Sequence, residues 1–139
     1  MSDHPLTREQ LQERLLRSPF NAFLNLEIQD VDPEQQEIVI RFTLRPEFER
    51  QAGAGQWHGG PIAAAIDIAG DYALAMLIGN PLPTIGYSVD YLKPAYGDLT
   101  LVARVRRRGK SVGIVDVEVL ADSKTLVALG RASYSTVAP

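Results

Sequence analysis

The stretch QWHGGPIAAAIDIAGDYA, residues 56–73, is almost wholly apolar after its first residues, yet it carries two carboxylates, Asp67 and Asp71. Pro61 is typical of the first turn of a helix, because backbone N–H groups there have no partner within the helix and proline has no N–H to leave unpaired. Apolar residues lie on nearly every face of a helix from Pro61 to about Ile78, so this helix must be covered all round. The sequence GNPLP, residues 79–83, ends it.

This apolar helix is long enough to be considered as a membrane span. However, a carboxylate such as Asp67 costs ~2.5–3.5 kcal/mol at the centre of a bilayer, and alanines offset little of that cost. We therefore expect a helix buried inside a soluble protein.

The rest of the chain predicts a sheet around this helix. Thr7 and Gln10 form a capping-box signal, and Leu11, Leu15 and Leu16 form a stripe, which predicts a short amphipathic helix within residues 1–18. From Phe23 onward the apolar residues alternate with polar ones, and this period of two indicates antiparallel strands. The six strand patterns are residues 23–32, 37–46, 84–92, 99–107, 112–121 and 125–136.

The predicted order is helix, two strands, one long buried helix and four strands. It indicates a single α+β domain over residues 1–139, with an antiparallel sheet packed on one central helix. A sheet of this size leaves edge strands, which tend to be paired or protected. Homodimerisation through such an edge is therefore plausible.

Composition excludes several classes of function. The chain has 139 residues, is 45% hydrophobic and 22% charged, and has a net charge of −3, which argues against a general nucleic-acid binder. It has no cysteine, and its two histidines, His4 and His58, lie far apart in the sequence. We therefore expect no disulfides, no metal and no cofactor. The N-terminal residues lack a secretory signal, so we expect a cytoplasmic location.

A carboxylate in the middle of a buried helix needs an explanation. Burying it costs several kcal/mol unless hydrogen bonds compensate, so Asp67 either satisfies a structural hydrogen bond or performs chemistry. Gly59 and Gly60 precede the helix, where free N–H groups favour an oxyanion. Asp67 lies ~10 Å beyond Gly60 along the helix axis, too far to act on the same carbonyl. Two antiparallel helices across a dimer interface could form a shared site.

The segment HGGPIAAAIDIAGDYA resembles the HGGxxAxxxDxA signature of hotdog-fold acyl-CoA thioesterases, in the phenylacetic-acid-degradation (PaaI-like) branch. Residues 87–135 resemble the remaining strands of that family. The resemblance implies a hotdog fold, a homodimer or homotetramer, and hydrolysis of a small or aromatic acyl-CoA. It implies that Asp67 is the general base or nucleophile and that Gly59 of the other subunit supplies the oxyanion donor. It also implies that His58 holds the loop and that Thr84 helps to position water.

One position departs from the family pattern. Relatives often carry Asn six residues before the histidine, whereas this chain has Ala52 there. Gln51 and Gln56 are the nearest amides, and neither is in register. Gly60 lets a ligand approach the backbone closely. Trp57 is a candidate for the acyl pocket, although packing explains an aromatic residue as well.

A basic cluster, RRRGKS, occupies a predicted hairpin. In the family this region lies near the CoA phosphates, and arginine suits phosphate geometry. A solvated turn explains the same residues equally well. The candidate CoA-binding residues are Arg106, Arg107, Arg108, Lys110 and Ser111.

Two further alternatives remain open at this point. Asp71 shares the Asp67 face of the helix and is either a second polar group of the site or a structural residue. The chain itself is either a thioesterase or a non-catalytic acyl-CoA-binding module of the same fold. A hotdog hydratase needs a different motif around its histidine, which WHGGP does not resemble.

Overall fold

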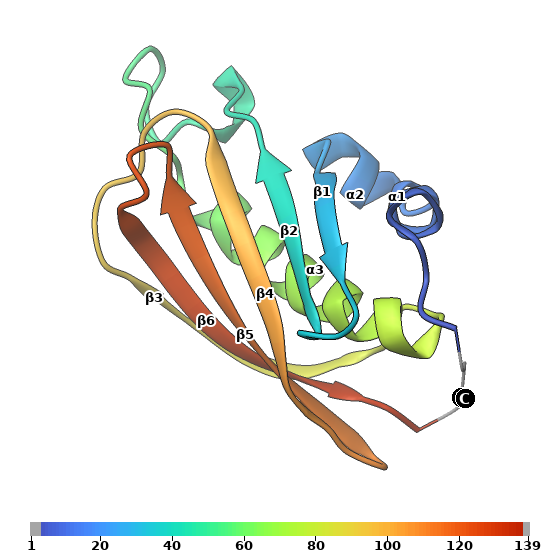
Figure 1. Cartoon of the computed structure of the whole chain (residues 1–139). Helices are drawn as coiled ribbons and strands as arrows, with labels where there is room; N and C mark the ends of the chain where they lie inside the picture. Colours follow the sequence, from blue (N-terminus) through green and yellow to red (C-terminus); the bar gives the residue numbers. More distant parts are fainter. Residues whose placement is uncertain (1–3, 138–139) are drawn as a thin grey trace.

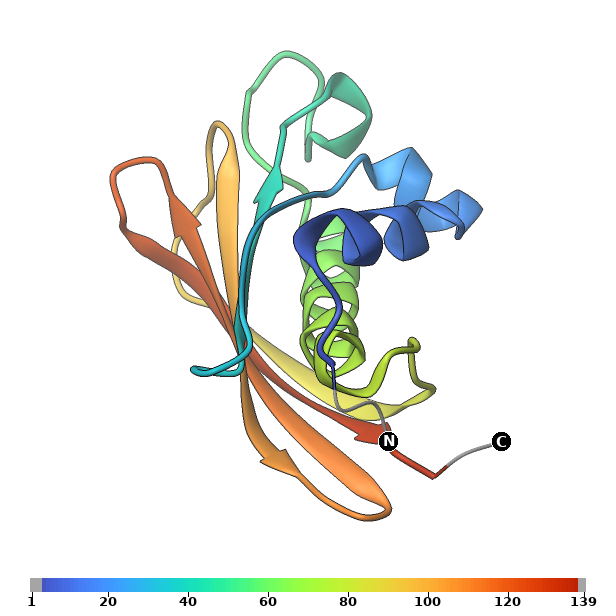
Figure 2. The ribbon, with the colours of Figure 1, turned by 45° about the vertical axis from the view of Figure 1, so that its right-hand side comes forward.

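The computed structural model describes residues 4–137, so residues 1–3 of the expected N-terminal segment lie outside the described part. A six-stranded antiparallel sheet curves around one long helix, α3 (Figures 1 and 2). The elements are α1 (Arg8–Leu16), α2 (Pro19–Leu24), β1 (Glu27–Asp32), β2 (Glu37–Phe42), the 3₁₀ turn η1 (Pro46–Phe48), α3 (Gly59–Ile78), β3 (Thr84–Tyr91), β4 (Leu99–Arg108), β5 (Val112–Ala121) and β6 (Leu126–Ser135). The expected α+β class is confirmed.

Helix α3 begins and ends as its flanking residues dictate. His58 is the N-cap, and Gly79 ends the helix in the left-handed region with φ of 106°. The helix starts at Gly59, two residues earlier than expected, because the His58 side chain caps the first turn. By length and composition α3 could cross a membrane, but 67% of its most apolar window is buried inside the fold.

The strand alternation predicts the core correctly. The inward side chains of β2, β4 and β5 are almost completely buried, whereas their neighbours, such as Asp116 and Glu118, point away from the core. Strand β5 pairs with β4 on one side and β6 on the other, as the two predicted turns require. The capping box of α1 is also present, with Thr7 and Gln10 bonded reciprocally.

Residues 19–24 differ from the expectation of a strand beginning near Phe23. They form the short helix α2, with Ser18 as N-cap and Pro19 in the first turn. Asn25 stops the helix in the left-handed region, with φ of 57° and ψ of 42°. The strand β1 therefore begins only at Glu27.

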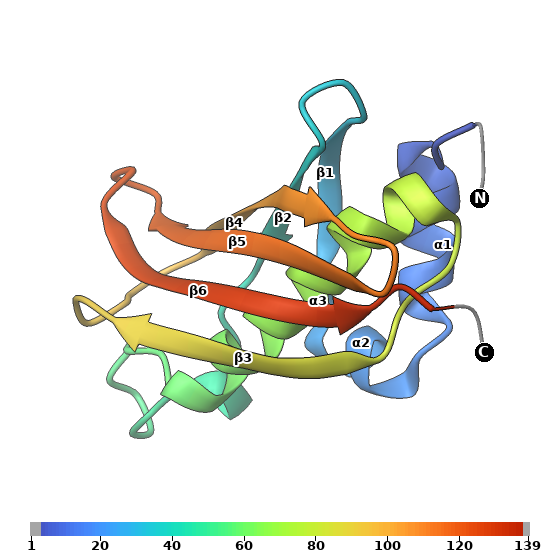
Figure 3. The same ribbon diagram turned by 90° about the horizontal axis from the view of Figure 1, so that it is seen from below.

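Strand β3 lies at an open edge of the sheet, because the strand order is β1-β2-β4-β5-β6-β3 (Figure 3). The chain leaves α3, returns past it and pairs with β6. Seven of the eight residues of β3 are exposed and only Val89 is partly buried, in contrast to β2, β4 and β5. Within residues 4–137, the apolar side chains of Ile85, Tyr87 and Tyr91 on β3 therefore remain exposed.

Candidate functional site

Asp67 lies in the middle of α3 and is partly buried. Its Oδ1 accepts a hydrogen bond of 2.7 Å from the Thr84 hydroxyl, at the first residue of β3. Within residues 4–137 no hydrogen bond engages the other carboxylate oxygen, Oδ2, which is left to accept from a water or to attack. The charge of Asp67 also adds to the rise that burial causes in the pKa of Tyr87, so this tyrosine lies nearby.

The main chain at Asp67 is held from the sheet. The Tyr134 hydroxyl donates a hydrogen bond of 2.6 Å to the Asp67 carbonyl oxygen. A Cβ atom at Gly70 would lie 2.3 Å from that hydroxyl oxygen, so the approach requires glycine. Burial strongly raises the pKa of Tyr134, which keeps its hydroxyl a neutral donor. The helix turn that carries Asp67 is therefore fixed by both β3 and β6.

The start of α3 leaves one N–H group free. His58 Nδ1 accepts from Gly60 N at 2.8 Å, so the Gly60 donor is occupied. The N–H of Gly59 donates to no other residue within the described part of the chain, although its carbonyl accepts from the Tyr91 hydroxyl at 2.6 Å. A Cβ atom at Gly59 would lie 3.0 Å from the Tyr91 ring. Among the described residues, Gly59 therefore keeps a free N–H at the start of α3, and the His58 side chain caps the first turn.

Asp67 and Gly59 are associated with opposite ends of the same edge strand. Thr84 begins β3 and contacts Asp67, whereas Tyr91 ends β3 and contacts Gly59. Eight helical residues separate the two groups, which corresponds to ~12 Å along the axis of α3. One chain therefore does not bring this carboxylate and this N–H group to a single carbonyl.

Asp71 lies one turn beyond Asp67 and accepts from the backbone of the α3–β3 connection. Its Oδ1 receives a hydrogen bond of 2.7 Å from Leu82 N. Burial raises the pKa of the Asp71 carboxyl to about 7; the Leu82 N–H opposes this shift and the Asp67 charge adds to it.

A shallow hollow beside the start of α3 is lined by two of the candidate site residues, Trp57 and Gly59. It is lined by Arg50, Gln56, Trp57, Gly59, Ile62, Tyr91, Leu92, Lys93, Pro94 and Ala95. Trp57 is only 3% exposed and packs on Phe42 and Phe48, so most of its ring belongs to the core. Its Nε1 donates to Gly97 O at 2.6 Å. Gln51 lies in an exposed turn beyond this hollow, as does Ala52.

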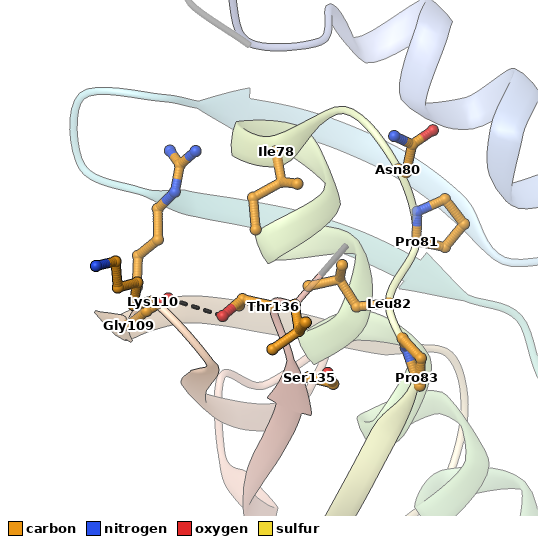
Figure 4. A pocket seen from close by; sticks show the side chains of 11 residues that line it. Ile78, Asn80, Pro81, Leu82, Pro83, Gly109, Lys110, Ser135 and Thr136 are labelled. Carbon is orange, nitrogen blue, oxygen red and sulfur yellow. Dashed lines mark hydrogen bonds between the residues drawn. The ribbon is translucent and has the colours of Figure 1, made fainter. Parts of the chain in front are cut away.

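The structure separates the basic residues into two groups. Arg106 faces Asp116 on β5, 3.5 Å away, together with Arg131. Arg108 and Lys110 instead border a mainly apolar cavity at the far end of α3 (Figure 4). The other lining residues are Ile78, Asn80, Pro81, Leu82, Pro83, Gly109, Ser135, Thr136 and Val137. The Ser111 carbonyl accepts from Thr136 N at 2.9 Å, which ties the hairpin to the end of β6.

Sequence reasoning missed Tyr134, Gly70 and Tyr91 as residues that contact the site. A glycine in the middle of an apolar helix was the available signal, because glycine costs about 1 kcal/mol there and needs a packing reason. Among residues 4–137, no group of three or more His, Asp or Glu side chains could hold a metal ion.

Comparisons with known proteins identify the family and the fold. The family model described as Thioesterase superfamily matches residues 54–128. A Halobacterium salinarum protein, provisionally described as an esterase, is 32% identical over 123 residues, with 81% of both chains covered. Escherichia coli PaaI, named an acyl-coenzyme A thioesterase, is 36% identical over 76 residues, 53% of this chain and 54% of PaaI.

Two further matches define the fold and the range of relatives. A solved structure titled as a protein from the thioesterase superfamily is 34% identical, with a TM-score of 0.87 and coverage of 94% of this chain and 98% of that chain. Escherichia coli YigI, named a medium/long-chain acyl-CoA thioesterase, is 27% identical over 135 residues, with 84% of both chains covered. The expected hotdog fold is confirmed.

Proposed function

This chain belongs to the thioesterase superfamily, and we propose that it hydrolyses the thioester of a small or aromatic acyl-CoA at a site shared between two subunits. The observation that carries the proposal is the placement of Asp67 and Gly59 at opposite ends of the exposed strand β3. Relatives named acyl-CoA thioesterases support the reaction class.

The proposed dimer pairs two β3 edges about a two-fold axis. Antiparallel pairing sets the beginning of one strand against the end of the other. The Thr84 end, with Asp67, would then lie beside the partner's Tyr91 end, with the partner's Gly59. The apolar side chains of β3 support such an interface, because Ile85 is 60% exposed and Tyr91 is 53% exposed.

In the proposed reaction, the thioester carbonyl oxygen accepts from the free Gly59 N–H of one subunit. Asp67 of the other subunit removes a proton from a water molecule that attacks the carbonyl carbon, or attacks the carbon itself. The tetrahedral intermediate collapses, the carbon–sulfur bond breaks, and CoA leaves as the thiolate. After direct attack, the acyl group remains on Asp67 as an anhydride, and water hydrolyses it to release the acid and restore the carboxylate. The Thr84 hydroxyl orients the carboxylate by binding Oδ1. A positioned general base typically contributes ~10²–10⁴-fold to the rate.

Arg108 and Lys110 are the candidates for the CoA phosphates, because both border the cavity of Figure 4 and arginine binds phosphate in a fixed fork geometry. The acyl preference is tested with a panel of short, aromatic, medium and long acyl-CoA substrates and detection of the free thiol. We expect the highest kcat/KM for short or aromatic acyl groups. A preference for long chains would overturn the substrate class, and no hydrolysis of any substrate would overturn the reaction.

The shared site is tested by combining two defective chains. Asp67→Asn and Gly59→Pro chains should each be nearly inactive alone, because the first lacks the base and the second lacks the N–H donor at a helix position that tolerates proline. Equal co-expression gives half mixed dimers, each with one intact site of two, so activity should return to about a quarter of the wild-type value. A site contained within one chain predicts no recovery. Separately purified and unmixed variants provide the baseline.

A further inference from the structure

The segment Pro81–Pro83 has a single backbone donor. Two of its three residues are prolines, which have no N–H, so only Leu82 can donate. That donor goes to Oδ1 of Asp71 at 2.7 Å. No Arg, Lys or His within residues 4–137 forms an ion pair with Asp71, and the titratable groups that act on it or respond to it are Asp67, Tyr72 and Tyr134. Its role is therefore that of an acceptor, which the proposed reaction does not use.

The distance between Leu82 and Thr84 along the chain after α3 matches the distance between Asp67 and Asp71 along the helix. From Asp67 to Asp71 the helix rises ~6.0 Å over four residues. From Leu82 to Thr84 an extended chain covers ~6.6 Å over two residues. Leu82 can therefore bind Asp71 while Thr84 binds Asp67, and both bonds are present at 2.7 Å. A slip of one residue would move the Thr84 hydroxyl by ~3.3 Å and break its bond to Asp67.

The sheet fixes only one side of this segment. Ser135 N donates to Pro83 O at 2.9 Å, which ties the segment to β6. Thr84 pairs with Tyr134 of β6, but the β3–β6 register is irregular between Thr84 and Gly86. Within residues 4–137, the bond between Leu82 N and Asp71 is the hydrogen bond that joins residues 81–83 to α3, and the Leu82 side chain also packs against the core.

We infer that Asp71 is a positioning residue for the hydrolysis: by holding the Leu82 N–H it fixes Thr84, and through Thr84 it orients the Asp67 carboxylate. This inference rests on the proposed function, in which Asp67 carries the reaction. In this role Asp71, the second carboxylate of α3, supports the reaction although it does not contact the substrate.

The first test compares two replacements of Asp71. Asp71→Ala removes the acceptor and should lower kcat roughly tenfold with KM unchanged, since small misplacements of catalytic groups can cost up to 10²-fold. Asp71→Asn keeps an oxygen acceptor and should restore most of the rate. The matched control is Asp32→Ala, because Asp32 Oδ1 accepts from Gln35 N at 3.0 Å in the β1–β2 turn. This control should change stability at most, with kcat retained.

The second test asks whether Asp71 acts through Thr84. Thr84→Val removes the hydroxyl at nearly constant volume. In that background Asp71→Ala should lower kcat by no more than about twofold, because coupled residues are not additive. A purely structural role predicts that the two losses multiply. Far-UV circular dichroism and thermal melting verify folding, and Asp71→Leu repeats the test if Asp71→Ala does not fold.

Different outcomes test the positioning role of Asp71 and the proposed thioesterase function. A wild-type kcat in Asp71→Ala, or multiplied losses in the double variant, overturns the positioning role even when Asp67→Asn is inactive. Full activity in Asp67→Asn overturns the proposed function itself. A tenfold loss that Asn restores and Thr84→Val abolishes supports both.

Discussion

At the scale of single residues, Asp67 combines burial with two anchors, the Thr84 hydroxyl on its side chain and the Tyr134 hydroxyl on its carbonyl. Asp67→Asn keeps the size and the acceptor for Thr84 but removes the basicity. We expect kcat to fall by ~10²–10⁴-fold with KM nearly unchanged. Stability should hold or rise, because an amide avoids the cost of a buried charge. Steady-state kinetics and thermal melting check this, and a wild-type rate contradicts the mechanism.

The Asp71 carboxyl gives a pH dependence of stability with a definite sign. Burial raises its pKa from 3.8 to about 7 in the folded chain. The folded state therefore holds a proton that the unfolded state loses, so this contribution is present below about pH 4 and is lost as pH rises through 7. At 1.36 kcal/mol per unit the loss amounts to roughly 4 kcal/mol.

Asp71→Asn should therefore gain stability relative to wild type as the pH rises. The measurement is the melting temperature of both chains between pH 4 and pH 8. We expect the difference between them to be small at pH 4 and largest at pH 8. A difference that stays constant over this range would show that Asp71 titrates with an ordinary pKa.

Gly70 and Tyr134 form a matched pair. A Cβ at position 70 would lie 2.3 Å from the Tyr134 hydroxyl oxygen, whereas the next ring carbon is 3.1 Å away. Gly70→Ala should destabilise the fold by ~1–3 kcal/mol through overpacking. Adding Tyr134→Phe removes the closest atom and should recover part of that loss. The free energy of unfolding of the single and double variants, measured with denaturant, tests this prediction. Equal stability of Gly70→Ala and wild type would contradict the packing argument.

At the scale of elements, the sequence predicted α3 and the strands β4, β5 and β6 well, because their periodic patterns reflect burial within one chain. Each of these strands buries one face against α3, and its alternation shows directly in the sequence. The end of α3 at Gly79 was also predictable, since GNPLP combines glycine with two prolines.

Two elements were less predictable for physical reasons. The segment PFNAFL reads as the beginning of an alternating apolar run, but Ser18 and Pro19 start a helix that Asn25 stops. The local capping signals outweighed the period, and they were visible in the sequence. The position of β3 at the edge beside β6 was not visible, because it depends on how the chain returns past α3. The contacts of Thr84 and Tyr91 follow from that return.

The β4–β5 hairpin carries two basic groups with different surroundings. Arg108 and Lys110 border the cavity, whereas Arg106 is paired with Asp116. If the first two hold CoA phosphates, Arg108→Ala and Lys110→Ala should raise KM with kcat unchanged. The increase should shrink as salt rises, because ions screen exposed charges. Arg106→Ala is the control on the same strand. An unchanged KM in both cavity variants would assign these residues to solvent.

At the scale of the whole molecule, one chain contains every group of the proposed site but does not assemble it. The sequence indicated this through the ~10 Å separation between Gly60 and Asp67 along the helix. In the proposed dimer, β3 is the edge that pairs, because its two ends contact Asp67 and Gly59 and its apolar side chains are largely exposed. Which groups meet across the interface depends on strand register, which no local pattern specifies.

The proposed interface gives the last prediction. Ile85 is 60% exposed on β3, so Ile85→Arg places one charged side chain from each subunit in the proposed apolar interface, where it would lose its water. We expect this variant to sediment as a monomer at micromolar concentration and to lose thioesterase activity, since each site needs both chains. Leu16→Arg on α1, where Leu16 is 43% exposed, is the matched control and should remain a fully active dimer. Activity that survives in a monomeric Ile85→Arg chain would show that one subunit suffices. A stable wild-type monomer at micromolar concentration would contradict the shared site in the same way.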